Sequence, residues 1–193
     1  MRLHAEEIKD IAIAAASLVF IFSYPEFLSD ASLLGVSAVA IASGFVLHEL
    51  AHRFVANNFG AAARFRIWKE GLVMALVLAI ATNGSFVFAA PGAVVISGLR
   101  FSLRGISSLG KREFGIISAA GPLTNIALAV FFSVLYNATF NTALLYAASI
   151  NVSLALFNMI PIPPLDGSKV FAWSAKAWAA IIALIMALRL FAG

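Results

Sequence analysis

The sequence predicts an all-α polytopic membrane protein, with about six membrane segments around a three-helix core and a short re-entrant β-hairpin. Of its 193 residues, 62% are hydrophobic and only 11% are charged, whereas about 25% of residues are charged in an ordinary soluble domain. The apolar residues form runs of membrane-spanning length, and most Lys and Arg residues lie between these runs. We therefore expect a lipid bilayer to surround most of the chain.

Composition also excludes several kinds of site and partner. The absence of cysteine excludes disulfides, thiolate zinc sites and cysteine nucleophiles. The net charge is +4, but the cations do not form one stripe with aromatic residues, so we expect no nucleic-acid partner. The length leaves no room for a separate soluble domain, and we predict a single domain over residues 1–193 with its core at about 33–170. The sequence carries no signal for an oligomeric state.

A first membrane helix is predicted from about Ile11 to Leu28, where the chain is apolar. A cleaved signal peptide is the alternative for such a segment. The preceding flank carries charges of both signs, however, and the bulky Tyr24-Pro25 stands where cleavage needs small residues. We therefore expect a membrane anchor.

The next helix is predicted from Leu33 to about Phe59, because this stretch is apolar almost throughout. Asp30 and Ser32 can cap its start, and Gly60 can end it. At about 40 Å, such a helix is long enough to cross a bilayer.

Two shorter apolar runs follow, from Gly71 to Ile80 and from Phe86 to Val95. Each is too short to span about 30 Å of hydrocarbon alone. The second run contains Pro91-Gly92 and β-branched residues, which suit a short strand that lines protein rather than lipid. We predict a re-entrant β-hairpin here, although the stretch from Leu72 to Ala81 is more helix-like than a simple hairpin.

Three further helices are predicted, from Phe114 to Tyr136, from Ala143 to Ile160 and from Phe171 to Phe191. With this arrangement most cations lie on one side of the membrane, which the positive-inside rule makes cytoplasmic. The opposite connections, around residues 25–32 and 137–142, contain no Lys or Arg, and only Arg189 is an exception. The cations expected on the cytoplasmic side are Arg53, Arg64, Arg66, Lys69, Arg100, Arg104, Lys111, Arg112, Lys169 and Lys176.

An H-E-x-x-H motif, His48-Glu49-Leu50-Ala51-His52, lies within the second predicted helix. Residues four apart share one helical face, so these two imidazoles can bind one Zn²⁺, and the carboxylate between them can accept a proton from water. The pattern also arises by chance. Here, however, two imidazoles and a carboxylate within an apolar helix would be costly if unpaired, and metal binding satisfies all three. We therefore predict one Zn²⁺ per chain.

A zinc site of the catalytic kind needs a third protein ligand and an open position. His4 lies in the charged N-terminal flank, where we expect it at the membrane interface. Asp166 is the remaining candidate, because the prolines of the preceding Pro161-Ile162-Pro163-Pro164 break the helix and can turn this carboxylate inward. Capping of the last helix is the alternative role for Asp166, and the residues alone leave both roles open.

These motifs resemble those of the site-2 protease family of intramembrane zinc metalloproteases. The resemblance depends on the order of His48-Glu49-x-x-His52 and, about a hundred residues later, Asn158-x-x-Pro161 followed by Leu165-Asp166-Gly167. Gly121-Pro122-Leu123-Thr124-Asn125 also matches the G-P-x-x-N of that family. The resemblance covers about 44–170, which is most of the chain.

The resemblance implies a role for each of these residues. It assigns zinc binding to three side chains, His48, His52 and Asp166, and so favours the ligand role of Asp166 over capping. It makes Glu49 the catalytic general base. Asn125 and Asn158 would be polar positions that hold the substrate or support the site.

The resemblance also implies the activity, which is hydrolysis of peptide bonds within or near transmembrane segments of membrane-protein substrates, as in regulated intramembrane proteolysis. The three-helix catalytic core would be formed near Leu33, Phe114 and Ala143, in a multi-pass protein of the cell membrane with its active site nearer the cytoplasmic face. The predicted hairpin would present a strand edge to the unwound substrate. No PDZ-like or nucleotide-binding regulatory domain is recognisable in the sequence.

A non-catalytic metal-binding membrane protein, either a pseudoprotease or a transporter, is the alternative function. A transporter would need polar ligands along the membrane, whereas the sequence offers one compact cluster. A pseudoprotease usually lacks the glutamate or a ligand, and neither is missing here.

Overall fold

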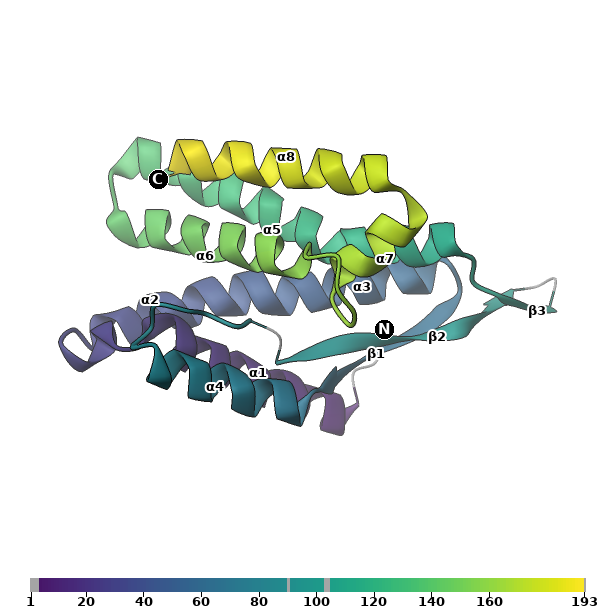
Figure 1. Ribbon diagram of the computed structural model, residues 1–193, viewed down its shortest axis with the longest axis horizontal. Coiled ribbons are helices and arrows are strands. Elements are labelled where there is room, and N and C mark those ends of the chain that lie inside the picture. The colour runs from purple at the N-terminus through teal and green to yellow at the C-terminus, as the bar shows by residue number, and fades with distance from the viewer. Residues whose placement is uncertain (1–3, 90, 103–104, 193) are drawn as a thin grey trace.

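One long helix separates two groups of helices (Figure 1). The computed structural model describes residues 4–89, 91–102 and 105–192. The long helix consists of α2 (Ser32–Ile41), a π-helical turn (Ala42–Val46) and α3 (Leu47–Asn58). On one side of it lie α1 (Ala5–Ser23) and α4 (Lys69–Ala81), and on the other lie α5 (Lys111–Thr139), α6 (Thr142–Asn158) and α8 (Ala175–Ala192).

The three helices predicted near Leu33, Phe114 and Ala143 are confirmed, and they pack together at the centre. Ile41 and Phe45 of the long helix pack in one buried cluster with Leu154 of α6. A second face of α6 packs against α5 and α8. The helix α6 therefore joins the two halves of the bundle.

Two helices in the described part of the chain are long and apolar enough to cross a membrane, Ser32–Asn58 and Lys111–Thr139. The shorter α6 is also apolar. Large apolar side chains are exposed on the outer helices, for example Val77, Val134 and Leu190. Such a surface suits lipid better than water, as expected of a membrane protein. The arrangement of six segments stays a prediction. Among its cations, Arg104 lies outside the described residues, as does the side chain of Arg100.

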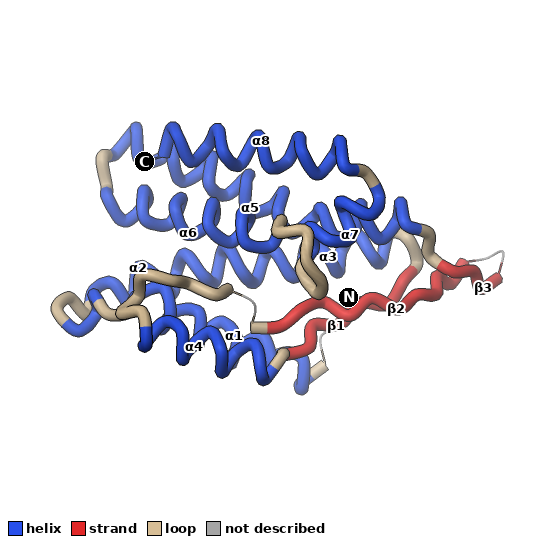
Figure 2. Tube along the Cα trace, in the orientation of Figure 1, coloured by secondary structure: helices blue, strands red, loops and turns tan. Residues whose placement is uncertain are grey.

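A three-stranded antiparallel sheet lies at one end of the bundle, and it corrects the all-α prediction (Figure 2). β1 (Ala61–Ile67) pairs with β2 (Gly92–Ser102), which pairs with β3 (Gly105–Ser108). The strand expected near Pro91-Gly92 is therefore present in β2. β1 alternates buried and exposed residues, but three alanines begin it and alanine is uncommon in strands.

The predicted re-entrant β-hairpin is not confirmed. Its first arm, Gly71 to Ile80, lies within helix α4, and residues 87–89 of the second arm have no regular structure. Leucine, alanine and methionine dominate the first arm, and these residues favour a helix over a strand. A turn at Asn83 and Gly84, both with positive φ, then reverses the chain.

The two ends of the chain also differ in detail from the prediction. The first helix ends at Ser23, and a 3₁₀ turn at Glu26–Leu28 follows. The last predicted helix is two helices, α7 (Asp166–Trp173) and α8, because Ser174 between them has an extended backbone. Its hydroxyl oxygen accepts a hydrogen bond from the backbone of Ala177, which starts α8 in a new direction.

A buried ion pair joins α1 to α3 and to the sheet. Glu7, which is 5% exposed, accepts a hydrogen bond from Arg53 of α3. The same carboxylate oxygen accepts a second bond, at 3.1 Å, from the backbone nitrogen of Phe65 in β1. Because a buried charge without a partner is costly, this pair holds the helix that carries the H-E-x-x-H motif against its neighbours.

Candidate metal centre

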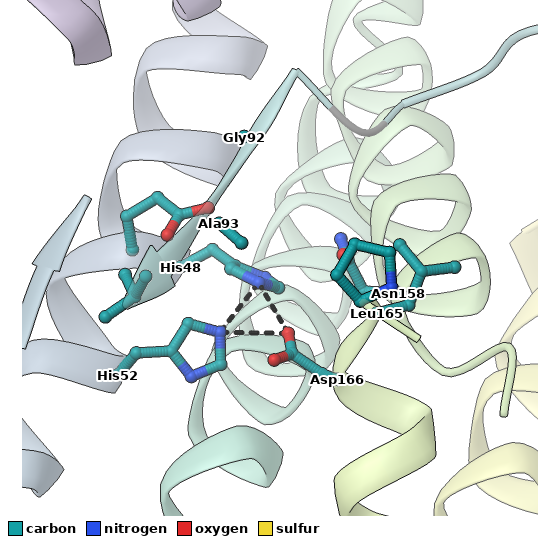
Figure 3. A pocket seen from close by; sticks show the side chains of 10 residues that line it. His48, His52, Gly92, Ala93, Asn158, Leu165 and Asp166 are labelled. Atoms are coloured by element: carbon teal, nitrogen blue, oxygen red, sulfur yellow. Dashed lines mark hydrogen bonds and ion pairs between the residues drawn. The ribbon is translucent and has the colours of Figure 1, made fainter. Parts of the chain in front are cut away.

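Three side chains converge on one point inside the bundle (Figure 3). His48 and His52 lie on successive turns of α3, and Asp166 is the first residue of α7. The Nε2 atoms of His48 and His52 are 3.0 Å apart, and Asp166 Oδ2 lies 3.3 Å from the first and 3.0 Å from the second. In a tetrahedral zinc site with bonds of about 2.0–2.1 Å, two ligand atoms lie about 3.4 Å apart. The three atoms are therefore spaced almost as zinc ligands are.

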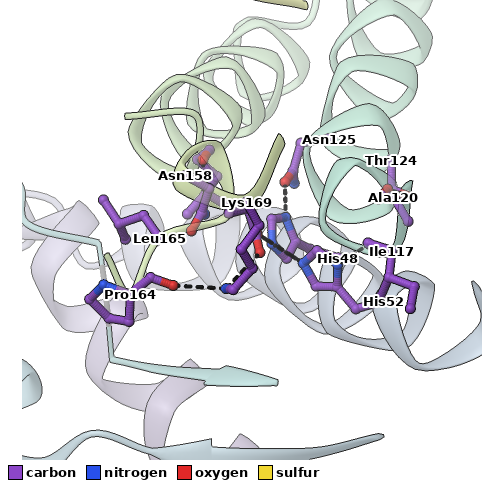
Figure 4. Close-up of polar contacts among 12 residues, drawn as sticks. His48, His52, Ile117, Ala120, Thr124, Asn125, Asn158, Pro164, Leu165 and Lys169 are labelled. Atoms are coloured by element: carbon purple, nitrogen blue, oxygen red, sulfur yellow. Dashed lines mark hydrogen bonds and ion pairs between the residues drawn. The ribbon is translucent and has the colours of Figure 1, made fainter. Parts of the chain in front are cut away.

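The outer nitrogens of both imidazoles are held by hydrogen bonds (Figure 4). His48 Nδ1 lies 2.5 Å from Asn125 Oδ1, and His52 Nδ1 lies 2.7 Å from the carbonyl oxygen of Ile117. Both oxygens are acceptors, so Nδ1 carries the proton of each neutral imidazole and Nε2 carries a lone pair. Two lone pairs and a carboxylate oxygen thus face one another, an arrangement that a bound cation would stabilise. The donor set fits Zn²⁺.

Helical periodicity explains why these groups meet. On the long helix Gly44, His48 and His52 recur every four residues, and on α5 Ile117, Gly121 and Asn125 do the same. Residues four apart share a face, and α3 packs against α5. The metal ligands of one helix therefore lie against the groups of the other that orient them.

Gly121 leaves room for the two imidazole rings. A Cβ atom at this position would overlap the Nε2 atoms of both His48 and His52. We expect Gly121→Ala to displace the rings and to weaken zinc binding by at least about tenfold, the lower end of the loss seen when the support of a ligand is removed. Zinc content after dialysis against a chelator, measured by mass spectrometry, checks this. Gly35→Ala is the control, because a Cβ there meets nothing within 4 Å; equal zinc in both variants would contradict the expectation.

The loop between α6 and α7 turns Asp166 toward the imidazoles, as the prolines predicted. The indole nitrogen of Trp178 donates to the carbonyl of Met159 at 2.7 Å, which holds the start of this loop. At its end, Lys169 Nζ donates to the carbonyl of Pro164 at 2.9 Å and lies 3.8 Å from Asp166 Oδ1 (Figure 4). One oxygen of Asp166 therefore faces a cationic side chain, and the other faces the two histidines.

A small cavity adjoins the ligand group. Its volume is about 20 Å³, and a water molecule needs at least about 10–15 Å³. Glu49 lines this cavity, is 7% exposed, and has one carboxylate oxygen, Oε2, that is buried without a hydrogen-bond partner among the described residues. Buried polar atoms normally have partners. Glu49 therefore borders the cavity and has a carboxylate oxygen without a partner in the described protein.

The two asparagines predicted for the site lie in different environments. Asn125 is fully buried and contacts His48. Asn158 lines the cavity, and its Nδ2 donates to the carbonyl of Leu154 in its own helix at 3.0 Å. His4 is exposed and contacts Arg64, so it is not part of the ligand group.

Three groups near the ligands were not predicted from the sequence as parts of the site: the carbonyl of Ile117, the amide of Asn151, which accepts a hydrogen bond from Asn125, and the amine of Lys169. Gly121 was noted only as part of the G-P-x-x-N motif. A buried asparagine within an apolar helix is costly, so Asn151 carried a signal that could have been used. The carbonyl of Ile117 carried none, because every residue has one. Gly121 and Lys169 follow from the packing of α5 and α7 against α3, which local sequence does not specify.

Comparisons with known proteins find a peptidase family and relatives named as zinc metalloproteases. The family model for Peptidase family M50 matches residues 133–182, which include Asn158 and Asp166. The chain is 41% identical over 185 residues to a protein of Methanocaldococcus jannaschii named "Putative zinc metalloprotease MJ0611", covering 93% of this chain and 91% of that protein. It is 30% identical over 155 residues to "Putative zinc metalloprotease YwhC" of Bacillus subtilis, covering 72% and 68%. No solved structure gives a significant match.

Proposed function

Because this chain belongs to peptidase family M50, the site-2 protease family of zinc metalloproteases, we propose that it is an intramembrane endopeptidase. Its substrates would be other membrane proteins, cut within or near their transmembrane segments, as in regulated intramembrane proteolysis. One observation carries the proposal: two imidazoles and a carboxylate converge inside a helical bundle, beside the unpartnered carboxylate oxygen of Glu49. Activity as a zinc protease needs this combination of a ligand group and a base.

Each residue would have a defined role. His48 Nε2, His52 Nε2 and Asp166 Oδ2 would hold one Zn²⁺ per chain. When bound, zinc supplies Lewis acidity, which polarises the scissile carbonyl and makes water a better nucleophile. Glu49 would take the proton from the attacking water and later donate it to the leaving amine. Asn125 would support the site by orienting His48.

The size of the cavity indicates how a substrate would bind. A helix is about 10–12 Å wide with its side chains, so it cannot enter a cavity of about 20 Å³. Gly92 and Ala93 of β2 lie on one side of the cavity, and Asn158 and Leu165 lie on another (Figure 3). Val94 and Pro164 also line it. We propose that the substrate unwinds locally and lies as an extended strand between these two sides. In the described part of the sheet, β3 pairs only with Leu99–Ser102, so a substrate strand could pair with the edge of β2 near the site.

The proposed location is the cell membrane, in a multi-pass protein that forms a single domain. His48 lies about 22 Å along a helix that starts at Leu33. If that helix enters from the outer face, as the positions of the Lys and Arg residues predict, the site lies nearer the cytoplasmic face. Substrate and water would then reach it from within the bilayer and from the cytoplasm, respectively.

The proposal is tested with purified protein reconstituted in lipid vesicles and a set of single-span substrates. We expect a cut within or next to the apolar segment, mapped by mass spectrometry, that stops when 1,10-phenanthroline removes zinc and returns when zinc is added. A peptide with the same scissile residues but no apolar segment is the control. If the control peptide were cut in a zinc-dependent way and the single-span substrates were not, the site would not be intramembrane. If the protein held its zinc and cut no substrate, the non-catalytic alternative would be favoured.

A further inference from the structure

A chain of buried amides leads from the ligand group to α6. Asn151 of α6 is fully buried, and its Nδ2 donates to the carbonyl of Ala147 at 2.9 Å. Asn125 Nδ2 donates to Asn151 Oδ1 at 3.0 Å and to the carbonyl of Gly44 at 3.1 Å. Asn125 Oδ1 then contacts His48 Nδ1 (Figure 4). Four helical segments thus meet through one set of hydrogen bonds.

Only one orientation of the two asparagine amides gives every hydrogen bond in this set a donor and an acceptor. Asn151 must present its oxygen to Asn125, because its nitrogen is used by the carbonyl of Ala147. If the Asn125 amide were turned over, its oxygen would face two other acceptors, Asn151 Oδ1 and the carbonyl of Gly44. Asn125 therefore presents its oxygen to His48, which fixes the proton on Nδ1 and leaves the lone pair on Nε2.

We propose that Asn151 is a positioning residue for the zinc centre, which acts through Asn125 to hold His48 Nε2 toward the other two ligands. The inference rests on the proposed function only in taking His48 as a zinc ligand. Asn151 belongs to α6, whereas the ligands belong to α3 and α7. It therefore couples a helix without a metal ligand to the geometry of the site.

The backbone of the long helix is adapted to this contact. A Cβ atom at position 44 would lie 2.8 Å from Asn151 Oδ1 and 3.1 Å from Leu154 Cδ1. A side chain at Gly44 would therefore push Asn151 away from Asn125. Gly44 also lies in the π-helical turn Ala42–Val46, and such turns interrupt the regular hydrogen bonding of a helix. The Gly44 carbonyl accepts a bond from the backbone nitrogen of Leu47 and a second one from Asn125 Nδ2.

The expected effect follows from the position of Asn151 in the chain of bonds. Loss of a group that orients a metal ligand weakens binding by about 10–100-fold, and this range applies to Asn125. Asn151 does not contact His48 and acts on it only through Asn125. When Asn151 is replaced, Asn125 still donates to the Gly44 carbonyl. We therefore expect about a tenfold weaker zinc affinity without Asn151, the lower end of that range.

The test is a double-substitution cycle on the zinc dissociation constant of the full chain in detergent, measured by competition with a chelating dye. The four proteins are the wild type, Asn151→Leu, Asn125→Leu and the double variant. If Asn151 acts through Asn125, the double variant binds zinc no more weakly than Asn125→Leu alone. Effects of the two substitutions that multiply would overturn the proposal, because Asn151 would then act independently.

Two further measurements separate positioning from a general loss of structure. With Co²⁺ in place of zinc, we expect altered visible absorption bands in Asn151→Leu and unchanged bands in the control Ser149→Leu, whose hydroxyl bonds only its own helix in the described structure. Asn151→Ala repeats the test with a smaller side chain, should Asn151→Leu fail to fold. Wild-type affinity and wild-type bands in either folded variant would overturn the proposal. Since no substrate is used, failure of the wild type to cleave would count against the proposed function alone.

Discussion

Glu49→Gln is expected to slow cleavage by about 10²–10⁴-fold while zinc stays bound. The amide cannot accept a proton from water, and loss of a general base slows a reaction by about 10²–10⁴-fold. Zinc should remain because Glu49 is outside the group of three ligand atoms, although it lines the same cavity. Cleavage of a single-span substrate in vesicles and zinc content by mass spectrometry measure the two effects separately.

A second glutamate provides the control for this substitution. Glu70 is exposed at the start of α4, so Glu70→Gln should cleave at the wild-type rate. Wild-type cleavage by Glu49→Gln would exclude Glu49 as the base. Loss of zinc together with activity would instead place Glu49 among the groups that hold the metal.

Asp166→Ala is expected to remove zinc from the protein. The two imidazoles of α3 would remain, but the third ligand atom, 3.0–3.3 Å from their Nε2 atoms, would be lost. Because loss of a group that merely orients a ligand costs about 10–100-fold in affinity, loss of a ligand should exceed about 100-fold. The zinc-to-protein ratio after dialysis against a chelator measures the effect.

An exposed aspartate is the control for the second substitution. Asp30 accepts a hydrogen bond from the backbone of Ser32 at 2.9 Å and lies at the start of α2, outside the ligand group. Asp30→Ala should keep its zinc through the same dialysis. If Asp166→Ala also kept one zinc per chain, Asp166 would not be a ligand, and the proposed site would lack its third group.

Local spacing was sufficient to predict the two histidines of the candidate site. His48 and His52 are one turn apart, so any helix places them on one face. Asp166 is separated from His48 by 118 positions. The residues alone made it a candidate but left a ligand role and a capping role open, and the resemblance to a known motif favoured the ligand role. Asn151 contacts Asn125 across two helices, and no periodic pattern in one helix predicts a contact with another.

Prediction of the fold from the sequence succeeded and failed for similar physical reasons. Long apolar helices were predicted because twenty or so consecutive apolar residues have few other structures in a bilayer. Whether a short segment forms a helix or a strand depends instead on its tertiary contacts. β1 forms because β2 offers it a partner, although its alanines do not favour a strand. The run in α4 was too short for its length to separate a helix from a hairpin arm.

The central claim is that His48, His52 and Asp166 bind one metal ion. X-ray absorption at the zinc edge of the purified wild-type protein tests it most directly. The geometry predicts one zinc per chain with two imidazole nitrogens and carboxylate or water oxygens at about 2.0–2.1 Å. A spectrum with fewer than two imidazoles, or a protein that retains no zinc, would contradict it.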